Sequence, residues 1–256
     1  MVDRITQHKN LNIDHVWNAG DSFACGYGIE NTRKSYPYMV ADSLECGLKS
    51  LARPGCCNYT ISKQIEYITH HLNEDDFVIV STTNEDRISY SSNSDTVKGG
   101  ITLERFNYST HQDDLLTKLP FKTTNEIQSE TISNILYAET KTIKQLTTVR
   151  KQAFQDYAKF VHDSGIKKDQ DNFMLLWKLS KLNLKTKNWV CVTHFQEIHD
   201  EFPNNTLLIN FGAICQSHPD KIGSGHFDET GHKIVYDKLE KWFVSNIERP
   251  YYDNQR

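Results

Sequence analysis

A serine, a glycine, an asparagine and a histidine stand in four separate segments whose order along the chain suits acyl transfer. Ser22 ends a Gly-Asp-Ser turn after a short apolar run, and three later segments contain Gly55, Asn84 and His226. Acyl transfer needs an activated hydroxyl, a base that takes its proton, and hydrogen-bond donors for the oxyanion that forms. The four residues offer the hydroxyl, the base and two of the donors.

The elements that would position these residues are short strands alternating with helices. Apolar runs of strand character alternate with stretches of helical period, which predicts an α/β fold with a mostly parallel sheet. Strands are expected at residues 13–19, 48–52, 77–82, 189–193 and 206–211, and helices at about 35–46, 61–72 and 228–249. In open parallel sheets, functional groups collect beyond the carboxyl ends of the strands, where Ser22, Gly55 and Asn84 would lie.

The segment from about residue 88 to 187 is longer than a connection between two strands requires, so we expect a mainly helical insertion. Thr123 and Glu126 form a capping box, and apolar residues then recur at helical spacing up to Ser164-Gly165. This pattern predicts one long helix, broken at most once, followed by a second at about 171–184. Polar residues 89–102 are expected to form a loop. The helices suit either a packing layer or dimer surface, or a lid over a substrate cleft.

The four segments resemble the four sequence blocks of the SGNH hydrolases, also called the GDSL esterase and lipase family. Gly20-Asp21-Ser22 is similar to the block with the nucleophile, and Gly55 and Asn84 to the glycine and asparagine of the second and third blocks. His226, with Gly231 after it, is similar to the last block. The resemblance covers both ends of the chain but not the middle. It implies a single domain, residues 1–256, with a three-layer α/β/α flavodoxin-like fold and a five-stranded sheet.

The resemblance also implies the roles of these residues. Ser22 would attack an ester carbonyl, and His226 would be its base. The oxyanion would be held by the backbone N–H groups of Ser22 and Gly55 and by the side-chain amide of Asn84. Asp21 is expected to be a structural turn residue.

The acid that orients the base departs from the family pattern. The family usually has an aspartate three residues before the histidine, where this chain has Gly223. Asp220 is the candidate for that role if the loop between it and His226 folds back, and a backbone carbonyl is the alternative. His232, preceded by Glu229, is the alternative base. It falls inside the predicted last helix, which favours His226.

Composition excludes several classes of function. The chain has 29 basic and 33 acidic residues, a net charge of -4 and no long run of one sign, so no nucleic-acid partner is expected. No signal peptide and no membrane-spanning run is found, which predicts a soluble protein of the cytoplasm or of a larger particle. The six cysteines have neither zinc-site nor disulfide spacing, and nothing indicates a metal or organic cofactor. Gly26-Tyr27-Gly28 lacks the third glycine of a dinucleotide site.

The sequence therefore predicts a soluble serine esterase without a cofactor. It would hydrolyse small esters or O-acetyl groups, including those on carbohydrates, through an acyl-enzyme at Ser22. The alternative is a decayed SGNH fold that serves as a structural or carbohydrate-binding module, with the helical insertion as its interaction surface. Gly223 at the usual acid position favours the alternative. The joint presence of Ser22, Gly55, Asn84 and His226 favours the esterase.

Overall fold

The computed structural model describes residues 13–84, 87–91, 127–131, 148–223 and 225–246. Its contacts divide the chain into two compact units. The first is formed within residues 1–54, 71–82 and 183–256, and the second within residues 55–70 and 83–182. The second unit contains most of the predicted insertion, together with a helix that precedes it. The division does not test the expectation of a single domain, which stays a prediction.

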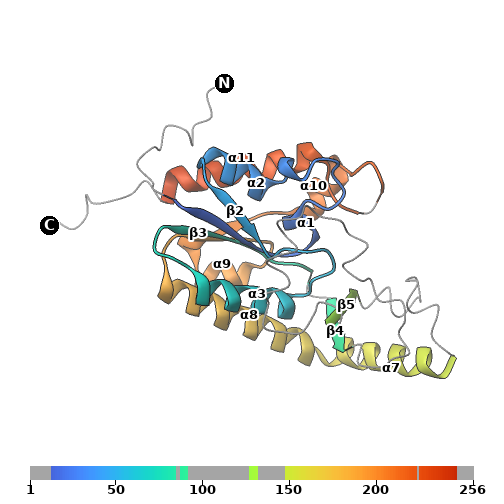
Figure 1. Ribbon diagram of the computed structural model, residues 1–256. Coiled ribbons are helices and arrows are strands. Elements are labelled where there is room, and N and C mark those ends of the chain that lie inside the picture. Colours follow the sequence, from blue (N-terminus) through green and yellow to red (C-terminus); the bar gives the residue numbers. More distant parts are fainter. Residues whose placement is uncertain (1–12, 85–86, 92–126, 132–147, 224, 247–256) are drawn as a thin grey trace. The chain divides into compact units, whose positions relative to one another are not determined.

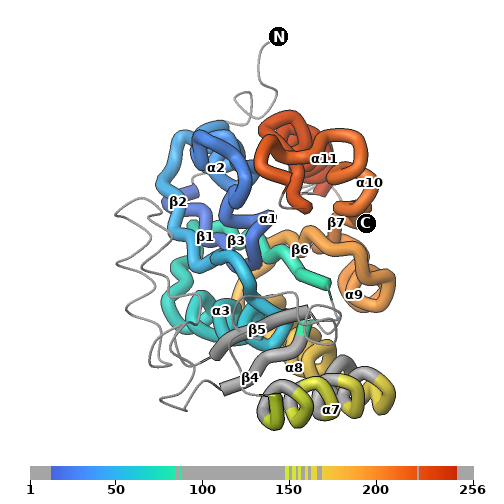
Figure 2. The backbone as a smooth tube through the Cα atoms, turned by 90° about the vertical axis from the view of Figure 1, so that its right-hand side faces the viewer, coloured from blue at the N-terminus to red at the C-terminus, as the bar shows by residue number. Residues whose placement is uncertain are grey.

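The first unit is built on a five-stranded sheet in which every pair of neighbours is parallel (Figures 1 and 2). Its strands are β1 (His15–Ala19), β2 (Gly47–Ser50), β3 (Asp76–Ser81), β6 (Trp189–Thr193) and β7 (Thr206–Leu208). They lie in the order β2-β1-β3-β6-β7, which is the strand order of flavodoxin-like three-layer α/β/α folds. The predicted α/β class with a parallel five-stranded sheet is confirmed.

The central strands explain why the sequence reads as continuous apolar runs. All six residues of β3 and all five of β6 are buried, as expected for parallel strands covered on both faces. In the register, Ala19 pairs with Val80, and Val80 with Cys191. The carboxyl ends of β1, β3 and β6 therefore meet at one edge of the sheet.

The helices of the first unit position the loops at this edge. They are α1 (Ser22–Cys25), the 3₁₀ turn η2 (Thr32–Lys34), α2 (Tyr36–Ser43), α9 (Gln196–Glu201), the 3₁₀ turn η4 (Pro203–Asn205), α10 (Phe211–Ser217) and α11 (Glu229–Asn246). Helices α2 and α11 pack side by side over one face of the sheet (Figure 1). The core there includes Val16, Ile79 and Val192 from the sheet and Val40 and Leu239 from the helices.

The second unit comprises α3 (Asn58–His71), β4 (Arg87–Ser91), β5 (Ile127–Thr131), α7 (Thr148–Ser164) and α8 (Ile166–Lys185). Strands β4 and β5 form an antiparallel pair. An ion pair of 2.7 Å between Lys178 Nζ and Glu66 Oε1 links α8 to α3, and it lowers the pKa of Glu66. No helix in the described part of the chain is long and apolar enough to cross a membrane.

Two predictions for the insertion are wrong. Residues 127–131, expected inside a long helix, form β5, and residues 89–91, expected in a loop, belong to β4. Pairing of polar, Ser- and Thr-containing segments with each other outweighs a weak helical spacing, because such residues have little helix preference. The predicted helix end is confirmed, since α7 stops at Ser164 and Gly165 has a φ of +66°. Thr123, Glu126 and residues 92–102 lie outside the described residues.

The fifth strand is also shorter than predicted. It ends at Leu208, and Phe211, expected in the strand, begins α10. The side chain of Asn210 accepts a hydrogen bond of 2.9 Å from the Ala213 N–H and so caps this helix. A polar capping residue within an apolar run therefore ends the strand early.

Candidate active site

Ser22 is placed by a tight turn between β1 and α1. A Cβ on Gly20 would lie 2.5 Å from the Ala24 Cβ and 3.0 Å from the Ser81 Cβ, so the close approach of these elements requires glycine. Asp21 is the N-cap of α1, and its carboxylate accepts a hydrogen bond of 3.0 Å from the Phe23 N–H. Asp21 is thus a turn residue, as expected. Ser22 is the first residue of the helix and is buried.

The structure brings Ser22 and His226 together, although 204 positions separate them in the chain. The Ser22 Oγ lies 2.7 Å from the His226 Nε2. This is the length of a strong hydrogen bond, and a neutral imidazole with its proton on Nδ1 accepts it from the hydroxyl. A serine hydroxyl that donates to an imidazole nitrogen is the arrangement from which a nucleophile is activated.

The loop that contains His226 folds back on itself. Pro219 and Phe227 form an antiparallel bridge, and the Asp220 N–H donates to the His226 carbonyl at 2.9 Å. Gly223 and Gly225 adopt left-handed φ values of +64° and +81°, which permit the reversal. The condition under which Asp220 was predicted to approach the base is therefore met.

Asp220 faces the second ring nitrogen of His226. Its Oδ2 lies 3.9 Å from the His226 Nδ1, which is ion-pair range but longer than a hydrogen bond. The Asp220 side chain is fully buried, and 13% of the His226 side chain is exposed. Ser22, His226 and Asp220 therefore form an ordered row in the first unit, with a tight contact at one end and a looser one at the other.

Gly28 is a residue of the site that the sequence pattern did not reveal. It has a φ of +91°, and a Cβ at this position would lie 2.7 Å from the Asp220 Oδ2. Both the left-handed conformation and the contact with the carboxylate require glycine. The only signal in the sequence was the pair of glycines around Tyr27, which is not a nucleotide-binding motif.

Aromatic rings surround the imidazole of His226. The ring of Phe23 lies 4.8 Å from it and that of Tyr27 lies 5.0 Å away in an edge contact. Phe23 also packs against Phe211 and Phe227. These contacts restrict the orientation of the imidazole, because a rotated ring would collide with its neighbours. Sequence reasoning missed these rings, since aromatic residues near a turn are equally suited to the core.

His232 occupies a different environment from His226. It lies in α11, 1% exposed, and its Nδ1 accepts a hydrogen bond of 3.4 Å from the Tyr36 N–H. Burial, followed by the nearby His226, lowers its pKa from 6.5 to about 3. A neutral, buried acceptor stabilises the contact between α2 and α11. The preference for His226 over His232 as the partner of Ser22 agrees with these contacts.

The neutral state of His232 predicts acid sensitivity. The unfolded chain binds a proton at this residue below about pH 6.5, whereas the folded chain does so only near pH 3. The free energy of unfolding should therefore fall by about 1.4 kcal/mol for each pH unit from 6.5 towards 3. Urea unfolding of the wild type and of His232→Gln at several pH values checks this. The wild type should show the steeper loss, and equal slopes would contradict the assignment.

Gly28→Ala should impair the site through Asp220. The added methyl group would push the carboxylate away from His226, and we expect a loss of serine reactivity of about ten- to a hundredfold, measured as the rate of labelling by a fluorophosphonate. Gly165→Ala, between α7 and α8, is the matched control, because Gly165 has a φ of +66° but no atom within 4 Å of the added Cβ. Equal losses in the two variants would mean that backbone strain, and not Asp220, is responsible.

Gly55 and Asn84 belong to the second unit. Gly55 has a φ of +78°, and a Cβ there would meet nothing within 4 Å. Asn84 is exposed, and its backbone carbonyl accepts a hydrogen bond of 3.3 Å from the Arg87 N–H. The preceding Thr83 N–H donates to the Asn58 Oδ1 at 3.0 Å, which holds this loop to the start of α3. Their role as oxyanion donors stays a prediction.

No metal site is found within residues 13–84, 87–91, 127–131, 148–223 and 225–246, where no three histidine, cysteine or acidic side chains converge. All six cysteines are free thiols.

The chain matches no protein-family model, and no curated protein is recognisably similar to it. What defines the class of this protein is therefore its fold, a flavodoxin-like parallel sheet, with a Ser-His pair beyond the carboxyl end of β1.

Proposed function

We propose that this protein is a serine esterase that acts through an acyl-enzyme at Ser22. The observation that carries the proposal is the distance of 2.7 Å between the Ser22 Oγ and the His226 Nε2. A supporting observation is the position of this pair beyond the carboxyl end of a strand in an open parallel sheet, where the functional sites of such folds lie.

The reaction would proceed in two halves. His226 Nε2 takes the proton of Ser22 as the Oγ attacks the ester carbonyl carbon, and it then gives this proton to the departing alcohol. Water, deprotonated by the same nitrogen, next attacks the acyl-enzyme; the imidazolium returns the proton to the departing Ser22 Oγ, and the acid is released. Asp220, opposite the other ring nitrogen, would favour the tautomer in which Nδ1 carries the proton. Neither half needs a metal or an organic cofactor.

The proposed substrates are small esters and O-acetyl groups, including those on carbohydrates. The oxyanion of the tetrahedral intermediate would be stabilised by the N–H groups of Ser22 and Gly55 and by the Asn84 amide. These three donors and the substrate class rest on the resemblance to the SGNH hydrolases.

Intact-mass analysis after exposure to a fluorophosphonate tests the proposal without knowledge of the substrate. We expect one adduct on the wild type, located at Ser22 and absent from Ser22→Ala and His226→Ala. Circular dichroism of each variant controls for folding. An unlabelled, folded wild type would overturn the proposal.

Asn84→Ala tests the predicted oxyanion role. Loss of one preorganised donor should lower kcat by about two to three orders of magnitude with little change in KM, because the bond strengthens only as charge develops. Steady-state kinetics on p-nitrophenyl acetate measures both constants. A rise in KM at unchanged kcat would instead place Asn84 in ground-state binding.

The alternative is a module of the same fold that no longer catalyses. The observation that favours it is the 3.9 Å separation of the Asp220 Oδ2 and the His226 Nδ1, because the acid of a complete triad accepts a hydrogen bond from the base and this distance is too long for one. Under this alternative, wild type and Ser22→Ala would be equally inert to the fluorophosphonate.

A further inference from the structure

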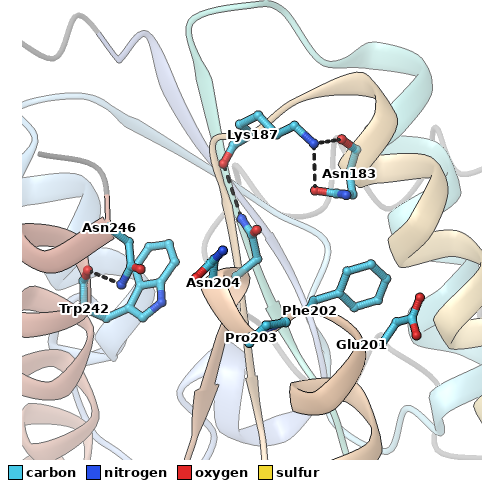
Figure 3. Close-up of a pocket in the computed structure, with 9 residues that line it drawn as sticks. Asn183, Lys187, Glu201, Phe202, Pro203, Asn204, Trp242 and Asn246 are labelled. Carbon is cyan, nitrogen blue, oxygen red and sulfur yellow. Dashed lines mark hydrogen bonds between the residues drawn. The ribbon is translucent and has the colours of Figure 1, made fainter. Parts of the chain in front are cut away.

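A cavity of about 510 Å³ lies in the first unit. Figure 3 shows the side chains that line it. Its lining comes from the residues that precede β6 and β7 and from the last turns of α11. Strands β1, β6 and β7 run parallel, so their first residues lie on one side of the sheet and their carboxyl ends on the other. The cavity lies at the starts of β6 and β7, whereas Ser22 follows the end of β1. The cavity is therefore separate from the candidate active site.

The cavity contains a buried donor without an acceptor. Trp242 is 8% exposed, and its indole Nε1 has no hydrogen-bond partner among the described residues. A buried indole N–H normally has a partner, because leaving the donor unsatisfied destabilises the fold. Trp242 lines the cavity, so a small rotation of the indole would bring this N–H within reach of an oxygen acceptor on a ligand.

The remaining lining is amide-rich, aromatic and balanced in charge. It has four asparagines, the rings of Phe202 and Trp242, and one basic and one acidic residue, Lys187 and Glu201. Lys187 Nζ is held by Asn183, at 3.0 Å from its carbonyl and 3.3 Å from its Oδ1. The charge balance disfavours a phosphate or a cation as ligand.

Some side-chain amides of the cavity already donate hydrogen bonds within the protein. Asn205 donates to the Trp189 carbonyl at 2.8 Å, and Asn246 to the Trp242 carbonyl at 2.9 Å. Asn204, which is exposed, stands between Trp242 and Pro203 in Figure 3. Its side chain can donate and accept at once, which matches a pair of neighbouring hydroxyl groups.

We propose that this cavity binds a neutral saccharide. A sugar ring combines hydroxyl oxygens, which would accept from the Trp242 indole and pair with Asn204, with apolar C–H faces that pack against Phe202 or Trp242. The volume suits a ligand of one to three sugar rings. The inference goes beyond the proposed esterase activity and does not depend on Ser22.

The indole N–H signals in ¹⁵N–¹H NMR spectra test the proposal directly, because the chain has four tryptophans and Trp242→Phe identifies the signal concerned. The probes are maltotriose, cellotriose, xylotriose and triacetylchitotriose, with inorganic phosphate as the charged comparison. We expect at least one trisaccharide to shift the Trp242 signal saturably, with a Kd of about 1 mM or lower.

Three variants test whether the trisaccharide binds in this cavity and not elsewhere on the protein. Asn204→Ala should weaken trisaccharide binding about five- to tenfold, the effect of one hydrogen bond, whereas the exposed Asn73→Ala should not. Ser22→Ala should bind as the wild type does, so failure of the esterase proposal leaves this result unaffected. The proposal is overturned if no trisaccharide moves the signal, if Asn204→Ala binds normally, or if phosphate alone saturates the site.

Discussion

Ser22→Ala is expected to lower the hydrolysis of p-nitrophenyl acetate by at least about a thousandfold. The reason is that the variant lacks the oxygen that bonds to the acyl group, while binding and charge stabilisation alone leave only a small residual rate. The turn should survive, because the Asp21 side chain, and not Ser22, caps α1. The measurement is kcat/KM with circular dichroism as the check on folding.

The matched control for this variant is Ser217→Ala. Ser217 is exposed at the end of α10, where its hydroxyl donates to the Ala213 carbonyl at 2.9 Å. Its replacement removes the same atom without touching the candidate site, so activity should remain that of the wild type. If Ser22→Ala and Ser217→Ala were equally active, Ser22 would not be the nucleophile.

His226→Gln should be nearly as damaging as Ser22→Ala, with an expected loss of about two to four orders of magnitude in kcat. Glutamine keeps a polar group near the Ser22 Oγ but cannot take its proton at neutral pH. The Ser22 hydroxyl would then remain unreactive towards a fluorophosphonate as well as towards an ester. Steady-state kinetics and intact mass measure the two effects.

His232→Gln is the control for His226→Gln, because it makes the same substitution at the other candidate histidine. It distinguishes a loss of catalysis from a loss of stability. The glutamine oxygen can accept from the Tyr36 N–H, as His232 Nδ1 does. This variant should therefore keep its reactive serine and change mainly in its stability at low pH. A reactive His226→Gln beside an inert His232→Gln would move the base into α11.

Much of the fold could be predicted from local patterns. The strand at Trp189–Thr193 was predicted with its observed bounds, because an apolar run without a polar interruption leaves little choice of where the strand begins and ends. The end at Leu208 was missed because the cap made by Asn210 depends on a backbone angle that the residue types do not reveal. Strand β5 was missed because its stability depends on β4, a partner distant in the sequence.

The candidate site divides in the same way. Residue type and order marked Ser22 and His226 in the sequence. They did not mark Gly28, because Gly28 meets Asp220, which is distant in the sequence, only in the folded chain. The polar cavity around Trp242 was not predicted either. Its lining comes from three separated segments, none of which has a motif of its own.

By itself, the sequence determined the periodicities, and with them the parallel α/β architecture, because strand and helix patterns are properties of neighbouring residues. It also determined which side chains could act as nucleophile and base. Only the tertiary structure decided that Ser22 and His226 lie 2.7 Å apart across 204 positions, that Asp220 turns back to 3.9 Å from the ring, and that His232 stays buried and apart. Such contacts depend on how the elements pack, and packing at long range is not encoded in any one segment.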